Sequence, residues 1–232
     1  MLFLSIFISS QKKIRESKDK LISTREGVIY ALAYQAGLRD FETGRHLDRT
    51  AQFASILARE LKKNHDLKKY INEQYIQDIF HAAPLHDIGK VGIPDSILLK
   101  EGPLSCDEWC TMKKHCEYGV EVLQKASERL PFKSFLDISI NLAASHHERW
   151  DGSGYPAGLR GEEIPLSGRI MAVADVYDAL RSKRPYKVPF DHERAVNIIK
   201  EGRGSQFDPK VVDAFLQVED KFRKISIDIA DK

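Results

Sequence analysis

The chain has 232 residues, which fit one domain, or one domain with a short appendage, and suffice for a core that needs no disulfide or structural metal. Its 42% hydrophobic and 30% charged residues exclude a wholly disordered chain. The 36 basic and 34 acidic side chains leave a net charge of +2, which argues against a surface that coats DNA or RNA polymers.

The N-terminus begins with a strongly apolar segment, MLFLSIFI, that is followed by Lys12, Lys13 and Arg15. This segment is too short to span a bilayer, which takes about 20 apolar residues. A secretory signal would place its charges before the apolar run, the reverse of the order here. Three interpretations stay open: a peripheral membrane tether, a helix that faces a partner, and the last turns of a membrane helix from a longer precursor.

Apolar residues at helical spacing predict a series of helices along the chain. The first is a charged lead-in helix over 11–32, with Ile14, Leu21 and Val28 on its apolar side and the domain beginning near residue 28. Further helices are predicted over 49–62, 75–86 (kinked at Pro84), 107–125, 135–147, 169–182, 192–201 and 209–225. Glycine and proline residues predict a long loop over 151–167. No alternation typical of strands is present, so the predicted class is all-α.

Three cysteines, Cys106, Cys110 and Cys116, lie within eleven positions. An odd, clustered set is not typical of a secreted disulfide framework, so the expected location is the reducing cytoplasm. Association with the inner face of the cytoplasmic membrane, through the N-terminal segment, stays open. The cysteine spacing suits either soft-metal ligation or the burial of small apolar residues on a helix.

Histidine is the commonest metal ligand among side chains, so the placement of the eight histidines is informative. Five of them stand beside a carboxylate or another histidine, or near predicted helix ends. Packing explains such a set poorly, because each buried imidazole needs a partner of its own. The candidates, with two aspartates of a later helix, are Glu42, His46, His86, Asp87, His115, His146, His147, Asp175 and Asp178.

The spacing of these residues carries chemical information. Glu42 and His46 are four residues apart, so a helix would direct both side chains at one point. The adjacent His86 and Asp87 would point about 100° apart, which lets the imidazole bind one metal while the carboxylate bridges two. Mixed imidazole and carboxylate sets suit Fe, Mn or Zn better than Mg or Ca. The candidates outnumber the needs of one ion and predict at least two, as in hydrolytic phosphoester sites.

Two segments carry a family resemblance: HDIGKVGIPD at 86–95 and HHERWDGSGYP at 146–156. The first resembles the HD signature of the HD phosphohydrolases, and the second resembles the segment that names their HD-GYP branch. Further matches occur at 158–159, 164–166, 169–170, 172–180, 184–187, 204 and 207–209. The ordered set covers about residues 32–216, so the chain is identified as a member of the HD-GYP family.

The resemblance implies an HD-domain helical bundle with the metal site in the bundle core. This domain would span 31–220, between an apolar stub with a lead-in helix at 1–30 and a C-terminal tail at 221–232. The implied activity is metal-dependent hydrolysis of the bacterial messenger cyclic di-GMP to the linear dinucleotide, and in some members on to GMP. Two or three divalent transition metal ions are implied, with Fe or Mn preferred and Zn, Ni and Co left open. The implied ligands are His86, Asp87, His115, His146, His147 and Asp175, with Glu42 and His46 as the pair that adds a third metal in some members.

The resemblance also implies roles for residues near the metals. Lys90 would lie at the scissile phosphate and, with Asp87, serve catalysis by neutralising charge or protonating the leaving oxygen. Arg184 and Lys187 match positions that hold the substrate's phosphates and guanine. Asp178 is expected to orient a ligand histidine rather than to bind a metal.

The loop that follows the two histidines leaves its roles open. Gly154, Tyr155 and Pro156 either shape this loop or contact a protein partner, and Trp150 either stacks on a guanine or packs in the core. Expected partners are cyclic di-GMP and an upstream sensor or diguanylate cyclase; a homodimer stays open. Two other functions compete: a non-catalytic receptor or scaffold, and hydrolysis of a different cyclic dinucleotide. Every implied ligand position holds a competent ligand, which favours the enzyme.

Overall fold

A computed structural model describes residues 2–37, 39, 44–182 and 188–230. Its regular elements in these ranges are helices, and the only β pairing among them is an isolated bridge between Arg203 and Phe207. The all-α class predicted from the sequence is confirmed. The α-helices are α1 Leu2–Gly37, α2 Gly44–Leu61, α3 Glu73–Ala82, α4 Asp95–Leu98, α5 Cys106–Lys113, α6 His115–Ser127, α7 Phe135–Ser145, α8 Leu166–Arg181, α9 His192–Glu201, α10 Pro209–Leu216 and α11 Glu219–Asp228. Three short 3-10 helices are η1 Ala83–Leu85, η2 Ile88–Gly92 and η3 Gly161–Glu163.

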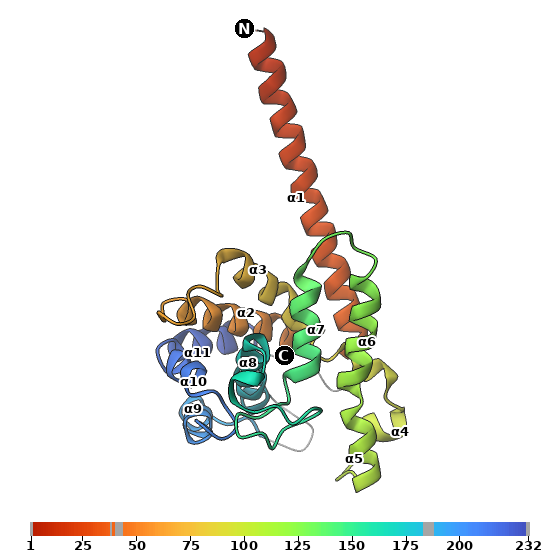
Figure 1. The fold of residues 1–232 in the computed structure, drawn as a ribbon, viewed down its shortest axis with the longest axis vertical. Helices are drawn as coiled ribbons and strands as arrows, with labels where there is room; N and C mark the ends of the chain where they lie inside the picture. The colour runs from red at the N-terminus through yellow and green to blue at the C-terminus, as the bar shows by residue number, and fades with distance from the viewer. Residues whose placement is uncertain (1, 38, 40–43, 183–187, 231–232) are drawn as a thin grey trace.

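Helix α1 is a long rod that extends well beyond the other helices (Figure 1). Ile14, Leu21 and Val28, which were predicted to form its apolar side, are 48%, 70% and 55% exposed. Among the α1 residues whose burial is described, Ile29 is the first that is buried, and it lies on another face, close to the predicted junction at residue 28. Helical spacing identifies an apolar stripe but does not say which stripe finds a partner. Within the described ranges, no helix combines the length and the hydrophobicity that a membrane span requires.

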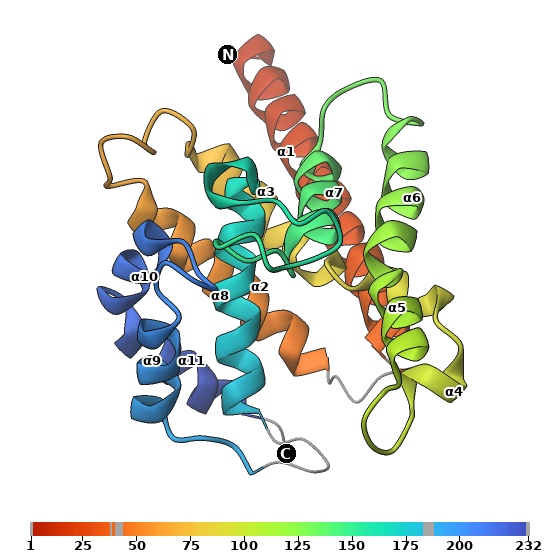
Figure 2. The same cartoon turned by 60° about the horizontal axis from the view of Figure 1, so that its bottom comes forward.

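The core is centred on α2 and α8, whose inner faces meet the C-terminal helices (Figure 2). The fully buried ring of Phe53 stacks on Phe222 with 4.2 Å between centroids, and Tyr177 contacts Phe53 edge-on at 5.3 Å. Phe215 closes this cluster against Phe222 at 5.1 Å. The segment expected to be a tail therefore begins in α11, which continues to Asp228 and packs into the domain through Phe222.

Three predicted helices are each divided in two. The segment 75–86 forms α3 and then η1, because Pro84 has no N–H with which to continue the helix. The segment 107–125 forms α5 and α6 with a break at Lys114, and 209–225 forms α10 and α11. Apolar spacing persists across such breaks, so periodicity alone does not reveal them. The break at Lys114 has a consequence for function, since it places His115 at the start of α6.

Candidate metal centre

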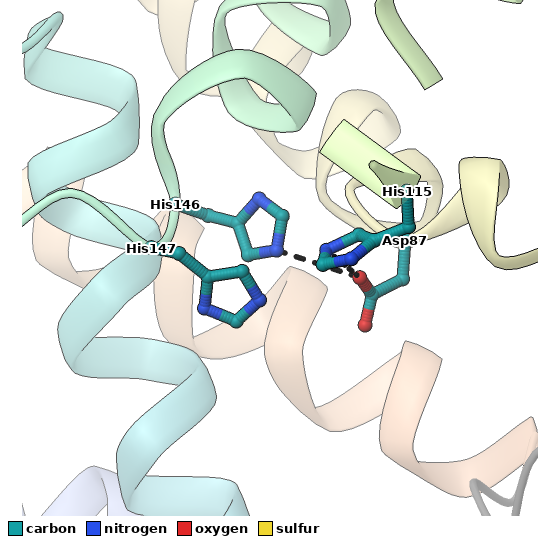
Figure 3. A group of neighbouring side chains, drawn as sticks. All are labelled: Asp87, His115, His146 and His147. Carbon is teal, nitrogen blue, oxygen red and sulfur yellow. Dashed lines mark ion pairs between the residues drawn. The ribbon is translucent and has the colours of Figure 1, made fainter. Parts of the chain in front are cut away.

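Seven of the candidate ligands converge in the interior as two adjacent groups. Within each group the donor atoms lie within 4.8 Å of one another. One group is His46, His86 and Asp175, and the other is Asp87, His115, His146 and His147. Figure 3 shows the second group, with the His115 and His146 rings directed at the Asp87 carboxylate. Five separate segments contribute: the first turn of α2, the η1–η2 junction, the start of α6, the end of α7 and α8.

The close approach of η2 to α6 explains how Asp87 and His115 meet. A Cβ atom on Gly89 would lie 1.9 Å from the His115 carbonyl oxygen and 2.4 Å from the Gly119 nitrogen. Only glycine lets the two backbones lie this close together. The glycine that follows the HD pair in the sequence therefore brings the N-terminus of α6, and with it His115, to the carboxylate.

Asp87 lies between the two groups. Its Oδ1 atom is 3.3 Å from Nε2 of His115 and 3.4 Å from Nε2 of His146. Its Oδ2 atom is 3.3 Å from Nε2 of His86 and 2.8 Å from Nζ of Lys90. One carboxylate oxygen thus faces each group, which is the arrangement that a bridging ligand requires.

The ring orientations of the histidines are fixed by bonds on the side away from Asp87. In three of them Nδ1 donates to a main-chain carbonyl, so Nε2 carries the free lone pair that a metal needs. These bonds join His86, His115 and His146 to the carbonyls of Ala83, Met112 and Leu142, at 2.8, 2.7 and 2.8 Å. Each carbonyl lies three or four residues before its histidine, so each bond forms within one turn of helix.

The buried donor atoms fit a metal centre better than an ordinary polar core. Nε2 of His86, Nε2 of His146 and Oδ1 of Asp87 are buried and accept no hydrogen bond. Buried polar atoms without partners are costly, and lone pairs that face one another 3.3–3.4 Å apart repel unless a cation lies between them. Imidazole with carboxylate is the donor set of Fe, Mn or Zn. The residues present therefore fit divalent transition metal ions.

The electrostatics of the site favour the ligating protonation states of His115, His147 and Asp87, whereas His86 is drawn toward its protonated form. Burial lowers the pKa of His115, and burial together with His146 lowers that of His147 further, so both rings are neutral at pH 7. Burial acts to raise the pKa of Asp87, but Lys90 and His86 outweigh it and hold the pKa well below its usual range. Burial also acts to lower the pKa of His86, and the Asp87 carboxylate outweighs it and raises that pKa.

Asp178 lies behind His46 and not in either donor group. Its Oδ2 atom accepts from Nδ1 of His46 at 2.8 Å, and Arg49 donates to the same carboxylate through Nε at 2.5 Å and Nη2 at 2.9 Å. The Arg49 and Asp178 side chains are only 4% and 1% exposed. The buried ion pair thus holds the ring of His46 so that Nε2 faces Asp175, 3.9 Å away.

A cleft of about 420 Å³ opens beside the second donor group. Its lining includes Trp109, Lys113, His146, His147, Tyr155 and Asp175. The loop over 151–165 forms one wall and is held by Glu148, a 3% exposed residue whose carboxylate accepts from the N–H groups of Ala157, Gly158 and Leu159 at 2.8–3.1 Å. A substrate in this cleft would meet the candidate metal ligands directly.

The other predicted loop residues have distinct positions. Tyr155 stacks on His147 with 4.7 Å between ring centroids, and a Cβ on Gly154 would lie 2.4 Å from the Arg149 nitrogen. Pro156 is exposed, and the Tyr155–Pro156 peptide is cis. Trp150 lies under the Arg169 guanidinium at 5.8 Å and is not part of the cleft lining.

Three predicted site residues, Glu42, Arg184 and Lys187, lie outside the described residues. Of the cysteines, Cys106 and Cys110 are exposed, whereas Cys116 is buried with Sγ 3.4 Å from Nε2 of His115. None of the three belongs to a donor group of the described chain.

Sequence reasoning assigned no role to three residues that the structure places at the site. Trp109 and Lys113 line the cleft, and Glu148 holds its loop. The available signal for the first two was their i, i+4 spacing immediately before His115. Because the sequence did not reveal the break at Lys114, that spacing did not show that the two side chains lie near the candidate metal ligands.

A helical bundle that gathers buried histidine and aspartate side chains into two adjoining groups beside a cleft is typical of metal-dependent hydrolases. The HD domain family model matches residues 40–211, so the chain belongs to the HD-domain family. This agrees with the HD-GYP resemblance found in the sequence.

Similar proteins include bacterial cyclic dinucleotide phosphodiesterases. The chain is 47% identical over 218 residues to a cyclic di-GMP phosphodiesterase of Vibrio cholerae, with 94% of this chain and 44% of that protein covered. It is 42% identical over 211 residues to the 3′3′-cGAMP-specific phosphodiesterase 2 of the same organism, with 91% and 38% covered. A crystal structure of a cyclic GMP-AMP-specific phosphodiesterase of V. cholerae shares the fold at a TM-score of 0.55 and 20% identity, with 89% and 51% covered. The chain thus spans about half or less of the length of these relatives.

Proposed function

We propose that this chain carries the active site of a metal-dependent phosphodiesterase that hydrolyses cyclic di-GMP to the linear dinucleotide. The observation that carries the proposal is the Asp87 carboxylate, which presents one oxygen to each of two buried histidine groups. The relative with 47% identity, which is named a cyclic di-GMP phosphodiesterase, supports the choice of substrate.

The residues that would hold the ions follow from the two groups. His46, His86 and Asp175 would bind one ion, and His115, His146 and His147 would bind another, with Asp87 shared between them. The donor set favours Fe or Mn, with Zn, Ni and Co as alternatives. The sequence resemblance alone supports a third ion; Glu42 and His46 would hold it, and His86, Asp175 and the shared Asp87 would then hold the first ion. Bound divalent ions would supply Lewis acidity at the phosphate and a water molecule of lowered pKa.

The protein's own groups would complete the hydrolysis. Water adds a hydroxyl group to phosphorus, the bond from phosphorus to the 3′-oxygen breaks, and the 3′-oxygen takes up a proton. The Nζ atom of Lys90 lies 2.8 Å from Oδ2 of Asp87, which supports a role in which its ammonium group donates that proton or neutralises charge. Arg184 and Lys187 are proposed, from the sequence resemblance, to hold the substrate's phosphates and guanine.

Helix α1 is the proposed route for regulation in the cytoplasm. Its described side chains between Ser10 and Val28 are exposed, and Ile29 is the first described side chain that is buried. An upstream sensor, a diguanylate cyclase or a second copy of the chain would act on this helix, and a membrane tether would act through its N-terminal end.

The test is product analysis with metal-loaded protein. Protein purified without oxygen, with its metals determined by elemental analysis, should convert cyclic di-GMP to the linear dinucleotide on a chromatogram. Asp87→Ala should form no product and bind less metal, whereas Asp220→Ala, an exposed aspartate away from the site, should match the parent. Binding of cyclic di-GMP without any product, in metal-loaded protein, would contradict the enzyme and favour a receptor.

A second substrate has a specific observation in its favour. The relative with 42% identity is named 3′3′-cGAMP-specific, so cyclic GMP-AMP should be assayed in parallel at equal concentration. A higher kcat/KM for cyclic GMP-AMP would move the assignment to that substrate and leave the chemistry of the metal centre unchanged.

A further inference from the structure

The outer wall of the cleft carries an aromatic side chain, Trp109, that is not buried in the core of the domain. Trp109 is 45% exposed, and α5, on which it lies, contributes no fully buried residue. The start of α5 is fixed instead by a capping box, in which Ser105 accepts from the Glu108 N–H and Glu108 accepts from the Ser105 N–H. An indole this exposed at the edge of a cleft is available to a ligand.

A series of ring contacts leads from a metal ligand out to this indole. Tyr155 stacks on His147 at 4.7 Å and 29°, and Trp109 contacts Tyr155 edge-on at 6.1 Å and 71°. The Nζ atom of Lys113 lies 5.2 Å from the Tyr155 ring centroid and 6.0 Å from that of Trp109. The Lys113 cation therefore lies over the rings of Tyr155 and Trp109 in the cleft, and the ring of Tyr155 in turn contacts His147.

The Lys113 ammonium group has no anionic partner in the described chain. It forms no ion pair with any carboxylate of the residues that the structure describes, although its side chain is half-buried. The contacts of Trp109 and Lys113 with Tyr155 are not needed to hold the loop of Tyr155. Glu148 already accepts from three N–H groups of that loop, and the Tyr155 N–H donates to the His147 carbonyl. At a cleft beside the proposed phosphodiesterase site, the Lys113 cation suits an anionic group of a ligand, and the Trp109 indole suits a flat ring.

We propose that Trp109, Lys113 and Tyr155 form the subsite for the half of a cyclic dinucleotide that does not react. Such a substrate has two phosphodiesters and two bases, of which the metal centre engages one phosphodiester. Trp109 stacks on the nucleobase of the other half, and Lys113 binds the phosphodiester that is not cleaved. This inference rests on the proposed function and adds to it the residues that select a dinucleotide over a simple phosphodiester.

The first test separates substrate binding from chemistry. Trp109→Ala and Lys113→Met should each raise KM for cyclic di-GMP about tenfold, because stacking and charge contacts of this size are lost. Their kcat, their metal content and their hydrolysis of bis(p-nitrophenyl) phosphate, which has no base and no second phosphodiester, should equal those of the parent. Trp109→Phe should restore most of the KM, since phenylalanine also stacks. Matched controls are Phe132→Ala, which is 65% exposed away from the cleft, and Lys114→Met, the exposed neighbour of Lys113.

A second test reads binding directly. The chain has two tryptophans, so Trp150→Phe leaves Trp109 as the only one. In that metal-loaded variant, a phosphorothioate analogue of cyclic di-GMP that resists cleavage should quench the Trp109 fluorescence in a saturable manner. Unchanged fluorescence at analogue concentrations that inhibit turnover would refute stacking on Trp109.

The outcomes distinguish the two proposals. A parent protein that cleaves neither cyclic di-GMP nor cyclic GMP-AMP refutes the proposed function. A parent that cleaves them while Trp109→Ala and Lys113→Met keep their KM within twofold refutes the subsite alone. Loss of metal or of bis(p-nitrophenyl) phosphate hydrolysis in these variants would show a structural role and would also refute the subsite.

Discussion

Replacing Asp178 with asparagine tests the support of the metal centre without touching a donor group. The carboxylate is 1% exposed and accepts from two nitrogens of Arg49, from Nδ1 of His46 at 2.8 Å and from Oγ of Ser182 at 3.1 Å. Asparagine has the same shape, but it carries no charge and turns one acceptor into a donor that would face other donors. The buried guanidinium of Arg49 would lose the negative charge of this carboxylate.

The expected loss of stability follows from these contacts. Breaking a buried ion pair by removing one partner costs about 3–5 kcal/mol. Arg49 would still donate to the Ile229 carbonyl at 2.9 Å and to Oγ of Ser182 at 2.8 Å, so we expect the lower end, about 3 kcal/mol. The His46 ring would lose its orienting bond, which should weaken metal binding roughly 10–100-fold.

Urea unfolding of metal-free protein measures the first effect, and competition with a coloured chelator measures the second. The control is Asp213→Asn, which removes an exposed ion pair with Arg203. The side chains of Asp213 and Arg203 are 57% and 46% exposed, so the substitution should change the free energy of unfolding by less than about 1 kcal/mol.

Burial acts to raise the pKa of Asp178, but Arg49 and His46 outweigh it and lower the pKa. The difference between parent and Asp178→Asn should therefore be complete above the ordinary aspartate pKa of about 3.9 and shrink as the pH falls below it. If Asp178→Asn lowered the free energy of unfolding no more than Asp213→Asn does, the structural role given to Asp178 would be refuted.

Three further substitutions test separate parts of the account. Lys90→Ala should lower kcat at least about 10²-fold with unchanged metal content; a change in KM alone would make Lys90 a phosphate contact instead. Gly89→Ala should lower the metal content, because the new Cβ would lie 1.9 Å from the His115 carbonyl oxygen and push α6 away; elemental analysis showing a full complement would refute this. Phe222→Ala should cost about 3–5 kcal/mol in urea unfolding, since Phe222 is fully buried against Phe53, and a loss under 1 kcal/mol would show that α11 is dispensable.

The candidate metal ligands could be named from the sequence because their signals are local. His86 with Asp87, and His146 with His147, are adjacent pairs at the ends of helical segments, and Gly89 marks the close approach beside the first pair. The structure brings these pairs together with His46, His115 and Asp175, which the sequence named but did not place in space.

Other features depend on tertiary contacts that periodicity does not encode. The exposed stripe of α1 and its buried stripe have the same helical spacing, and only packing decides between Val28 and Ile29 as the inward position. Trp109 resembles an ordinary apolar residue of a long helix until the break at Lys114 turns α5 toward the loop of Tyr155. Phe222 lies near the C-terminus, and its burial depends on an aromatic cluster assembled from four helices.

The central claim is that Asp87 joins two metal ions in one catalytic centre, and metal reconstitution tests it most directly. Metal-free protein should be titrated with Mn²⁺ or Fe²⁺ without oxygen while the cleavage of cyclic di-GMP is followed by chromatography. Turnover should appear only as the second equivalent per chain binds, and Asp87→Ala should neither hold two equivalents nor turn over substrate. Full turnover of metal-free protein, or of protein with a single equivalent, would contradict the account.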